Sequence, residues 1–438
     1  MWIDFLTHPC QSPATTWALG VSMNRGVISS NTIFLIGNAA SFTWLARMRC
    51  AGIRITELRC RISRGGCIHS LCGTRIGDRW KRRPMPERLL IIKWGALGDV
   101  VLATSHLETV ISHFPDHECW LLTAPDYAPL FEHHPRLRVK AFPRRGAAVM
   151  WKAAQWVRAM RFEQIFDFQG SERSAFLTWI SGAPLRAGMG FRLPYTHSIH
   201  FQGYEREHIF DRLNRLLLHV GLPEADPNPI LHLPTDEIVR AEAWLRKKQL
   251  VPGSFVIQHA GSSVRWLSKR WPAEYFAVLA ERLQERGLTT VWVGSGEDLD
   301  LNRFLSSRTG VDATDAFGVT ELCAVARHAR LAIVNDSGPM HLLSTAAIPV
   351  YAFFGPTDWR KSHAVGQKER VLIGNAECSP CHLEICPAKR AHKCLRGITP
   401  EYVLGRIEAD GLLAPAADSI RVTQGGSCPS RSLESGIH

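Results

Sequence analysis

The sequence lacks an uncharged apolar run strong enough to span a membrane. The nearest stretch, residues 27–46, carries no charge, but serine, threonine and asparagine dilute its hydrophobicity. The first 24 residues also lack the basic start and compact apolar core of a secretory signal peptide. These absences predict a cytoplasmic location and leave open peripheral contact with the inner face of a membrane.

Acidic residues are scarce in one segment of the chain. Of the net charge of +12, residues 47–83 carry +9, with eleven arginines and lysines against two acids. The chain from Pro84 onward carries only +3. Because the excess charge belongs to an arm and not to the folded body, nucleic acid is not the expected partner, although an arm that binds RNA or anionic lipid stays open. Residues 1–84 are expected to be a poorly ordered basic extension, or to precede a natural start at Met85.

Beyond residue 84 the pattern is that of an α/β protein. Short apolar runs suited to buried parallel strands alternate with helical spacing, which predicts right-handed βαβ units. The expected strands are 89–94, 119–124, 138–142 and 164–170, then 255–261, 289–296, 331–336 and 349–355, with helices at 100–113, 147–161 and from Pro400.

A proline-rich connector at residues 222–234 interrupts this alternation. It predicts two Rossmann-like domains, 85–234 and 235–414, which face each other across a cleft. Residues 415–438, rich in serine and glycine, are expected to form a disordered tail. In open α/β sheets ligands bind at the carboxyl ends of the strands, so the informative residues should lie there.

Two of these strand ends carry charged side chains. The first is GALGDV (95–100), where Asp99 either stabilises the first turn of a helix or faces a ligand; the motif is not G-x-G-x-x-G. The second is HAGSSVRWLSKRWP (259–272), with Lys269 and neighbouring arginines. These cations suit phosphate oxygens, although a solvated basic loop is the plain alternative.

A third strand end reads NDSGPMHLLSTAA (335–347). Asp336 and Ser337 could simply cap the helix that starts near Pro339. The free N–H groups of such a helix start can also bind a phosphate or a sugar hydroxyl, and His341 follows one turn later. Facing a second, basic strand end, this cluster indicates a phosphorylated ligand.

NDSGPMH, with KRWP upstream and GALGDV near the start of the folded part, resembles glycosyltransferase family 9, the ADP-heptose:lipopolysaccharide heptosyltransferases. The resemblance spans about residues 85–410 and implies the GT-B architecture of two facing Rossmann-like domains. It implies an inverting transferase that moves a heptose or related sugar from an ADP-sugar to a lipopolysaccharide inner-core acceptor at the inner membrane surface.

The resemblance also implies roles for individual residues. Asp99 corresponds to the family's base. The donor side would comprise Lys269, Glu297, Asp336, Ser337, Gly338 and His341, with Glu297 the loosest match. The segment DFQGSERS (167–174) looks like the family's acceptor side, which assigns Asp167, Gln169 and Arg173 to it.

The chemistry follows from these residue types. A carboxylate can remove the proton of an acceptor hydroxyl as general base, and a lysine can stabilise the departing diphosphate. Direct displacement by one hydroxyl inverts the anomeric carbon. No acidic cluster such as Asp-x-Asp sits at the predicted phosphate site, so we expect a reaction that requires no metal cofactor.

A cysteine cluster follows the second sheet. Its spacing suggests a metal clip more than disulfides in a cytoplasmic chain, and the expected ligands of a structural zinc ion are Cys378, Cys381, Cys386 and Cys394. Four reduced cysteines in a packed loop are the alternative.

Two other functions stay open at this stage. A nucleotide-sugar epimerase could use the same two-domain architecture, because fold does not fix function. A protein that binds through its basic arm is the other alternative.

Overall fold

The structure is a computed structural model that describes residues 48–50, 53–55, 87–190, 193–200 and 207–413. The contacts divide the chain into two units, Met1–Arg83 and Pro84–His438. In the first unit, β1 (Met48–Cys50) pairs antiparallel with β2 (Ile53–Ile55). The expectations for the rest of residues 1–84 and for the tail 415–438 lie outside the described residues.

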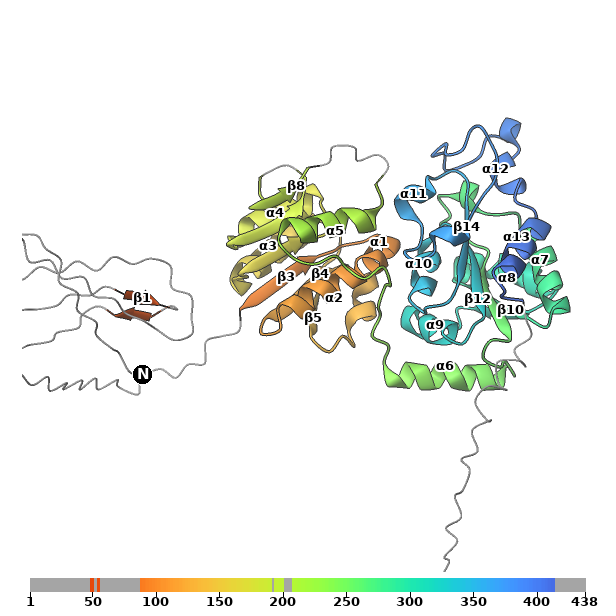
Figure 1. Ribbon diagram of the computed structural model, residues 1–438, viewed down its shortest axis with the longest axis horizontal. Helices are drawn as coiled ribbons and strands as arrows, with labels where there is room; N and C mark the ends of the chain where they lie inside the picture. Colours follow the sequence, from red (N-terminus) through yellow and green to blue (C-terminus); the bar gives the residue numbers. More distant parts are fainter. Residues whose placement is uncertain (1–47, 51–52, 56–86, 191–192, 201–206, 414–438) are drawn as a thin grey trace, which may run out of the picture. The chain divides into compact units, whose positions relative to one another are not determined.

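The first half of the second unit is a six-stranded parallel sheet in the order β5-β4-β3-β6-β7-β8 (Figure 1). Its central strand β3 reads RLLII, and four of its five residues are buried, as a strand covered on both faces requires. The strands are β3 (Arg88–Ile92), β4 (Glu118–Thr123), β5 (Leu137–Ala141), β6 (Gln164–Asp167), β7 (Leu185–Met189) and β8 (His197–Ile199).

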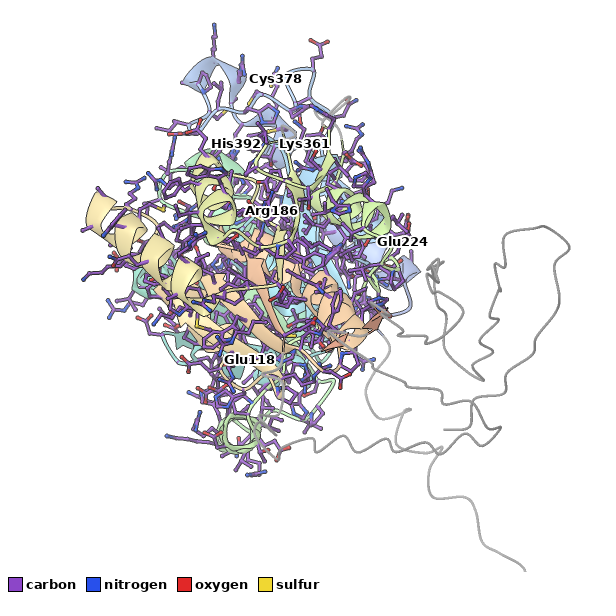
Figure 2. All side chains as sticks on the ribbon, turned by 90° about the vertical axis from the view of Figure 1, so that its left-hand side faces the viewer. Glu118, Arg186, Glu224, Lys361, Cys378 and His392 are labelled. Atoms are coloured by element: carbon purple, nitrogen blue, oxygen red, sulfur yellow. The ribbon has the colours of Figure 1, made fainter. Side chains whose placement is uncertain are left out.

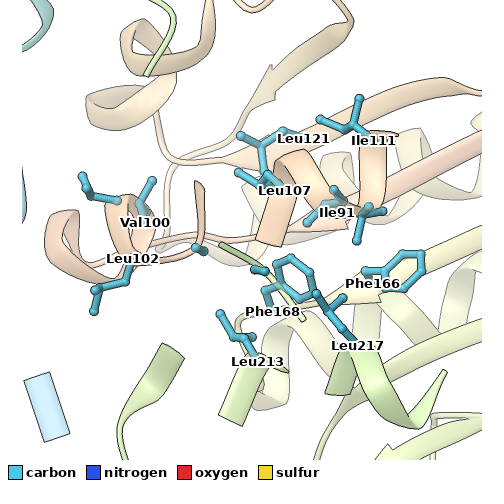
Figure 3. Close-up of a cluster of buried hydrophobic side chains, with 14 of the residues drawn as sticks. Ile91, Val100, Leu102, Leu107, Ile111, Leu121, Phe166, Phe168, Leu213 and Leu217 are labelled. Carbon is cyan, nitrogen blue, oxygen red and sulfur yellow. The ribbon is translucent and has the colours of Figure 1, made fainter. Parts of the chain in front are cut away.

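Helices cover both faces of this sheet. Figure 3 shows the core on one face, where α1, α2 and α5 pack side chains such as Leu107 and Leu213 against Ile91 and Phe166. The other face packs Leu90 and its neighbours against α3 and α4. The elements are α1 (Leu97–Leu102), α2 (Thr104–His113), η1 (Pro125–Phe131), α3 (Ala147–Met160), α4 (Glu172–Ser181) and α5 (Ile209–His219).

The second half repeats the design with the order β11-β10-β9-β12-β13-β14, again all parallel. Its strands are β9 (Phe255–His259), β10 (Thr289–Gly294), β11 (Val311–Thr314), β12 (Leu331–Asn335), β13 (Val350–Phe354) and β14 (Val371–Ile373). Its helices are α6 (Thr235–Lys247), α7 (Ala273–Glu285), α8 (Leu299–Ser306), α9 (Val319–Ala326), α10 (Gly338–Ser344), α11 (Trp359–Ser362), α12 (Lys393–Arg396) and α13 (Pro400–Ala409), with short 3-10 turns η3 (Leu267–Lys269), η4 (Gly296–Asp298), η5 (Lys368–Arg370) and η6 (Ala388–Arg390).

The predicted two-domain α/β architecture is confirmed, and each of the eight predicted strands exists. The predicted helix 100–113 is wrong in one respect, since α1 begins earlier and a break at Ala103 separates it from α2. No element occupies residues 222–234, the predicted connector. Among the described residues, no helix combines the length and hydrophobicity that a membrane crossing needs.

Candidate active site

Helices α1 and α10 form one of the contacts between the two halves of the second unit. A Cβ atom added at Gly98 would lie 2.4 Å from Cδ2 of His341, and one at Gly338 would lie 2.8 Å from Cδ2 of Leu97. Neither position tolerates a side chain without movement. The two glycines thus permit the close approach that places Asp99 near His341.

Asp99 lies in the first turn of α1, but the N-cap residue is Ala96, so Asp99 does not cap the helix. Its side chain is 47% exposed and its Oδ2 lies 3.9 Å from Nζ of Lys93. Lys93 is buried at the end of β3 and donates a hydrogen bond of 3.2 Å to the carbonyl oxygen of Phe168. Burial lowers the pKa of Lys93, while the charges of Asp99 and Asp167 oppose that shift. An accessible carboxylate therefore stands beside a buried amine.

Lys269 and Asp336 form an ion pair on the opposite half. Nζ of Lys269 lies 2.7 Å from Oδ2 of Asp336, and the hydroxyl of Thr357 donates to the same oxygen at 2.6 Å. Asp336 is buried, with 5% of its surface exposed. Its carboxylate is thus committed to side-chain partners.

The capping interpretation of Asp336 and Ser337 is wrong. Ser337 occupies the N-cap position of α10, but its side chain accepts no hydrogen bond from the helix N–H groups. The Ser337 hydroxyl instead donates to the carbonyl oxygen of Asn335 at 3.2 Å. The backbone N–H groups at the start of α10 are left without a side-chain cap.

His341 is the residue on which the charged groups converge. It is buried, and its Nδ1 has no hydrogen-bond partner among the described residues. Burial lowers its pKa to about 4, although the charges of Asp336 and Asp99 raise it and that of Lys269 lowers it. The ring packs against Gly98, next to the expected base, and lies one turn after the expected donor residues Asp336 to Gly338, as a neutral imidazole near pH 7.

The expected acceptor segment follows β6. Asp167 is fully buried: its Oδ1 accepts the N–H groups of Gln169 and Gly170 at 3.0 Å each, and the Tyr195 hydroxyl donates to its Oδ2 at 2.7 Å. Burial raises the pKa of Asp167 despite these hydrogen bonds. Its carboxylate braces the turn instead of facing solvent.

The other two acceptor-side residues are more accessible. Gln169 is partly exposed, and its Oε1 accepts the N–H of Trp94 at 2.8 Å, which joins the turn after β6 to the turn after β3. Arg173 is exposed in the first turn of α4 and donates to the carbonyl oxygen of Arg144. Only these two of the three side chains could reach a ligand in this conformation.

Glu297 is exposed in η4, and its side chain makes no hydrogen bond or ion pair within the described ranges. Its neighbour Asp298 is buried, accepts the N–H of Ser295 at 3.2 Å and lies 3.5 Å from Nε2 of His259. Burial opposes ionisation of Asp298, but the hydrogen bond and charge of His259, the Ser295 N–H and the charge of Arg270 together lower its pKa. Asp298 and Asp300 form an Asp-x-Asp sequence, yet the Asp300 side chain is fully exposed, so the two carboxylates do not converge.

Asn335 is a residue that the sequence analysis missed as part of the site. Its Nδ2 donates to the carbonyl oxygens of Ala260 and Gly261 at 2.8 and 3.0 Å, and its Oδ1 accepts the N–H of Trp271 at 2.9 Å. These bonds tie the end of β12 to both ends of the loop that carries Lys269. A polar residue closing the apolar run LAIV is the one sequence signal for this role.

The four clustered cysteines are all free thiols. Burial raises the pKa of Cys394, and the other three thiols raise it further, so the four lie in one neighbourhood. Figure 2 labels Cys378 and His392 in this region. No three of these sulfurs lie within 4.8 Å of one another in the described part of the chain, whereas a tetrahedral zinc site needs separations of about 3.8 Å. The zinc site stays a prediction.

A second group of metal-ligating residue types is Glu108, His134 and His232, whose ligand atoms lie within 4.8 Å of one another. Nε2 of His134 and Nε2 of His232 approach the same Oε1 of Glu108 at 2.9 and 2.7 Å. Because Nδ1 of His134 accepts the N–H of Arg136 at 3.1 Å, the neutral ring carries its proton on Nε2. The group therefore links α2 to the connector by hydrogen bonds, and its nitrogen lone pairs are not free to bind a metal ion.

Comparison with solved structures defines the class of fold as GT-B, two α/β domains each built on a parallel sheet. The crystal structure of the family 9 glycosyl transferase from Veillonella parvula has a TM-score of 0.64 and 22% sequence identity, and the match covers 75% of this chain and 97% of that one. The structure of ADP-heptose LPS heptosyltransferase II from E. coli has a TM-score of 0.60 and 19% identity, covering 74% and 98% of the two chains.

The chain belongs to glycosyltransferase family 9 (heptosyltransferase), whose model matches residues 150–392. Lipopolysaccharide heptosyltransferase 1 from Pseudomonas aeruginosa is 25% identical over 365 residues, which covers 75% of this chain and 99% of that protein. The chain is thus a glycosyltransferase, and the resemblance seen in its motifs is confirmed.

Proposed function

We propose that this glycosyltransferase moves a heptose, with inversion, from an ADP-sugar to a lipopolysaccharide inner-core acceptor. The observation that carries the proposal is the position of His341. Its ring packs against Gly98, next to Asp99, and its helix α10 follows directly on Asp336, which pairs with Lys269 at 2.7 Å. A carboxylate suited to activating an acceptor and a cation suited to holding a diphosphate therefore meet around one buried imidazole. Relatives named as heptosyltransferases, including the ADP-heptose enzyme, support the choice of donor and acceptor.

Asp99 acts as general base in this proposal. Its carboxylate is half exposed, so an acceptor hydroxyl can reach it, and proton removal in the transition state makes that hydroxyl a competent nucleophile. The hydroxyl attacks the anomeric carbon opposite the leaving diphosphate, which inverts the configuration. Gln169 and Arg173, at the accessible edge beside this site, bind the acceptor.

The donor half stabilises the leaving group. Lys269 holds the diphosphate, with the uncapped N–H groups of Ser337 and Gly338 as further donors. Asp336 fixes the lysine, at a separation of 2.7 Å, and Glu297 binds the nucleoside from its exposed position. These cationic and N–H groups supply the charge stabilisation without a catalytic metal ion. The domain division at residues 234/235 separates acceptor from donor binding.

We also propose that Cys378, Cys381, Cys386 and Cys394 hold one structural zinc ion. The loop that carries them lies against the donor half, since Ser268 bonds to the carbonyl oxygen of Leu383 and His392 contacts the Ser268 carbonyl at 2.7 Å. Metal analysis of the purified protein should find about one ion per chain. Metal-free protein that melts at the same temperature after replacement of Cys378 and Cys381 by serine would exclude the clip.

The proposed reaction is tested by Asp99→Asn with ADP-heptose and a delipidated core acceptor in solution. Asparagine cannot take a proton, so turnover should fall about 100- to 10,000-fold while donor affinity changes no more than a few-fold. Asp300→Asn, at a fully exposed carboxylate, is the matched control and should retain full activity. Near-normal turnover of Asp99→Asn would reject the base, and sugar conversion without any acceptor would favour an epimerase.

A further inference from the structure

Helices α3 and α4 expose aromatic side chains on the outer face of the first domain. Trp151, Phe176 and Trp179 are 63%, 38% and 62% exposed. All three lie on the helices that cover one face of the sheet, with their buried sides formed by residues such as Ala153 and Leu177. Figure 2 views the molecule from the side on which these two helices lie. Two tryptophans so exposed on neighbouring helices are unusual for a surface that meets only water.

The two helices are held side by side at both ends. Arg158 of α3 donates to the carbonyl oxygen of Ile180 at the end of α4, at 3.2 Å. Arg173 of α4 donates to the carbonyl oxygen of Arg144, which precedes α3. The exposed sides of α3 and α4 therefore lie next to each other. We name this surface the α3–α4 face, and it comprises Trp151, Lys152, Arg158, Glu172, Arg173, Phe176 and Trp179.

The charge of this face is mostly positive, with four basic residues in or just ahead of the two helices against one acid. Lys152, Arg158 and Arg173 are exposed, with Arg145 just ahead of α3, whereas Glu172 is the one acid in the two helices. Aromatic rings among basic side chains are the composition of surfaces that lie in the headgroup region of anionic bilayers. The rings bury apolar area there, and each cation adds attraction to anionic lipid.

We infer that the α3–α4 face docks on a bilayer that contains anionic phospholipid. The inference rests on the proposed function, because a lipid-anchored acceptor must reach the site from a membrane. The face is continuous with the acceptor segment: Gln169 lies in the turn that leads into α4, and Arg173 lies in its first turn. Docking here brings the acceptor edge of the first domain to the membrane surface.

A second copy of the chain fits this face less well than a bilayer does. A symmetric dimer through the α3–α4 face would bring Lys152 and Arg158 of one copy toward the same residues of the other, and like charges repel. A bilayer supplies the opposite charge and also accepts the rings. Charge complementarity therefore selects the lipid surface.

Oxidative footprinting with mass spectrometry tests the location directly on the full chain. With vesicles of phosphatidylethanolamine and phosphatidylglycerol, oxidation of Trp151 and Trp179 should fall several-fold, while Phe304 and Tyr402, 48% and 46% exposed on the second domain, should not change. Binding of the chain to vesicles with unchanged oxidation of Trp151 and Trp179 would overturn the inference, because another segment would then make the contact. Protection that appears without vesicles as protein concentration rises would also overturn it, in favour of a dimer.

Matched variants test the energetics. The double variant Trp151→Ser/Trp179→Ser should weaken vesicle partitioning at least about tenfold, whereas Phe304→Ser/Tyr402→Ser should leave it unchanged. Lys152→Ser should weaken partitioning about fivefold, and Lys247→Ser, at an exposed lysine of α6, should not. Equal effects of face and control variants would reject the α3–α4 face.

Activity measurements separate this inference from the proposed function. With a delipidated acceptor in solution, Trp151→Ser/Trp179→Ser should match the unaltered chain, and with acceptor embedded in vesicles it should be slower by about the loss in partitioning. An unaltered chain that binds vesicles through Trp151 and Trp179 but transfers no sugar to the soluble acceptor would reject the proposed function alone. Unaltered activity of the double variant on embedded acceptor would reject the docking face alone.

Discussion

At the scale of single residues, Lys269 is expected both to bind the donor diphosphate and to stabilise the leaving group. In the structure its charge is balanced by Asp336 at 2.7 Å, and its Nζ lies 5.1 Å from the centre of the Trp266 ring. Only 18% of the lysine side chain is exposed, so a diphosphate that approaches it meets a cation already oriented by its partners. A preoriented cation stabilises developing charge without the reorganisation that a mobile surface lysine requires.

Replacement of this lysine should therefore affect both donor binding and the chemical step. Lys269→Ala is expected to weaken ADP-heptose binding and to lower kcat about 100- to 1,000-fold, as measured by calorimetry and single-turnover kinetics. Arg265→Ala in the same loop is the control, because Arg265 turns to Glu384 and is 73% exposed. If Lys269→Ala binds the donor and turns over as the unaltered chain does, Lys269 is only a solvated loop residue.

Asn335 shows how one buried side chain can hold the donor loop. Its amide makes three hydrogen bonds to backbone groups of Ala260, Gly261 and Trp271. Asn335→Ala leaves those buried backbone groups without a hydrogen-bond partner, and each such group lowers the free energy of unfolding by about 1–3 kcal/mol. The urea midpoint should fall correspondingly, and donor affinity should fall with it, whereas Asn228→Ala on the exposed connector should change neither. A urea midpoint of Asn335→Ala equal to that of Asn228→Ala would show that the loop carrying Lys269 does not depend on Asn335.

At the scale of elements, the contact between α1 and α10 depends on the absence of a side chain. A Cβ at Gly98 would lie 2.4 Å from the His341 ring, so Gly98→Ala must push the two helices apart. We expect kcat/KM to fall at least about 100-fold, as displacement of a reacting group by 1 Å does, with secondary structure retained by circular dichroism. Gly405→Ala in α13, where a Cβ meets open space, is the control. Full activity of Gly98→Ala would mean that the two helices do not need this contact.

Central and edge strands differ in how well the sequence predicts them. The seven predicted interior strands match the structure to within three residues, because continuous apolar runs such as LAIV of β12 are buried on both faces. The edge strand β5 is predicted as well. In the second unit the sequence pattern misses four strands: β7, β8, β11 and β14. Three of them, β8, β11 and β14, are edge strands, and β7 lies beside one. Their residues are partly exposed, as in β11 with one buried residue of four, so their apolar signal is weak.

The residues of the candidate site also differ in how well the sequence predicts them. Motif residues such as Asp99 and His341 could be identified from their position after strands, because topology brings strand ends together. Their partners could not, since the bonds of Thr357 to Asp336 and of Lys93 to Phe168 join residues that no local spacing relates. Asp167 also looked like a ligand-facing group, and only the fold shows that Tyr195 and the turn N–H groups occupy its oxygens.

At the scale of the whole molecule, buried histidines link stability to pH. Burial lowers the pKa of His106 to about 4, that of His208 to about 3 and that of His341 to about 4, from an ordinary value of 6.5. His106 lies in the core of the first domain, and His341 lies at the candidate site. His208 links the two halves, because its Nε2 contacts the His363 carbonyl oxygen at 2.9 Å. The folded chain therefore resists protonation at these three histidines.

The sign of the effect follows from which state takes up protons first. Below pH 6.5 the unfolded chain protonates these histidines while the folded chain keeps them neutral, so the free energy of unfolding should fall as pH drops from 6.5 to about 4. Each histidine contributes a slope of about 1.4 kcal/mol per pH unit once the pH is well below 6.5. Glu108, whose pKa is lowered from 4.5 because the bonds from His134 and His232 outweigh its burial, adds a further loss of stability only below pH 4.5.

Urea unfolding between pH 7.5 and 5.0 measures the contribution of the histidines without that of Glu108. His106→Gln should reduce the slope of the unfolding free energy against pH by about the contribution of one histidine. His113→Gln, at an exposed position, should leave the slope unchanged. Since His106→Gln can also shift the stability at pH 7.5, the slope and not the midpoint decides, and equal slopes in the two variants would show that His106 is protonated as readily in the folded chain as in the unfolded one.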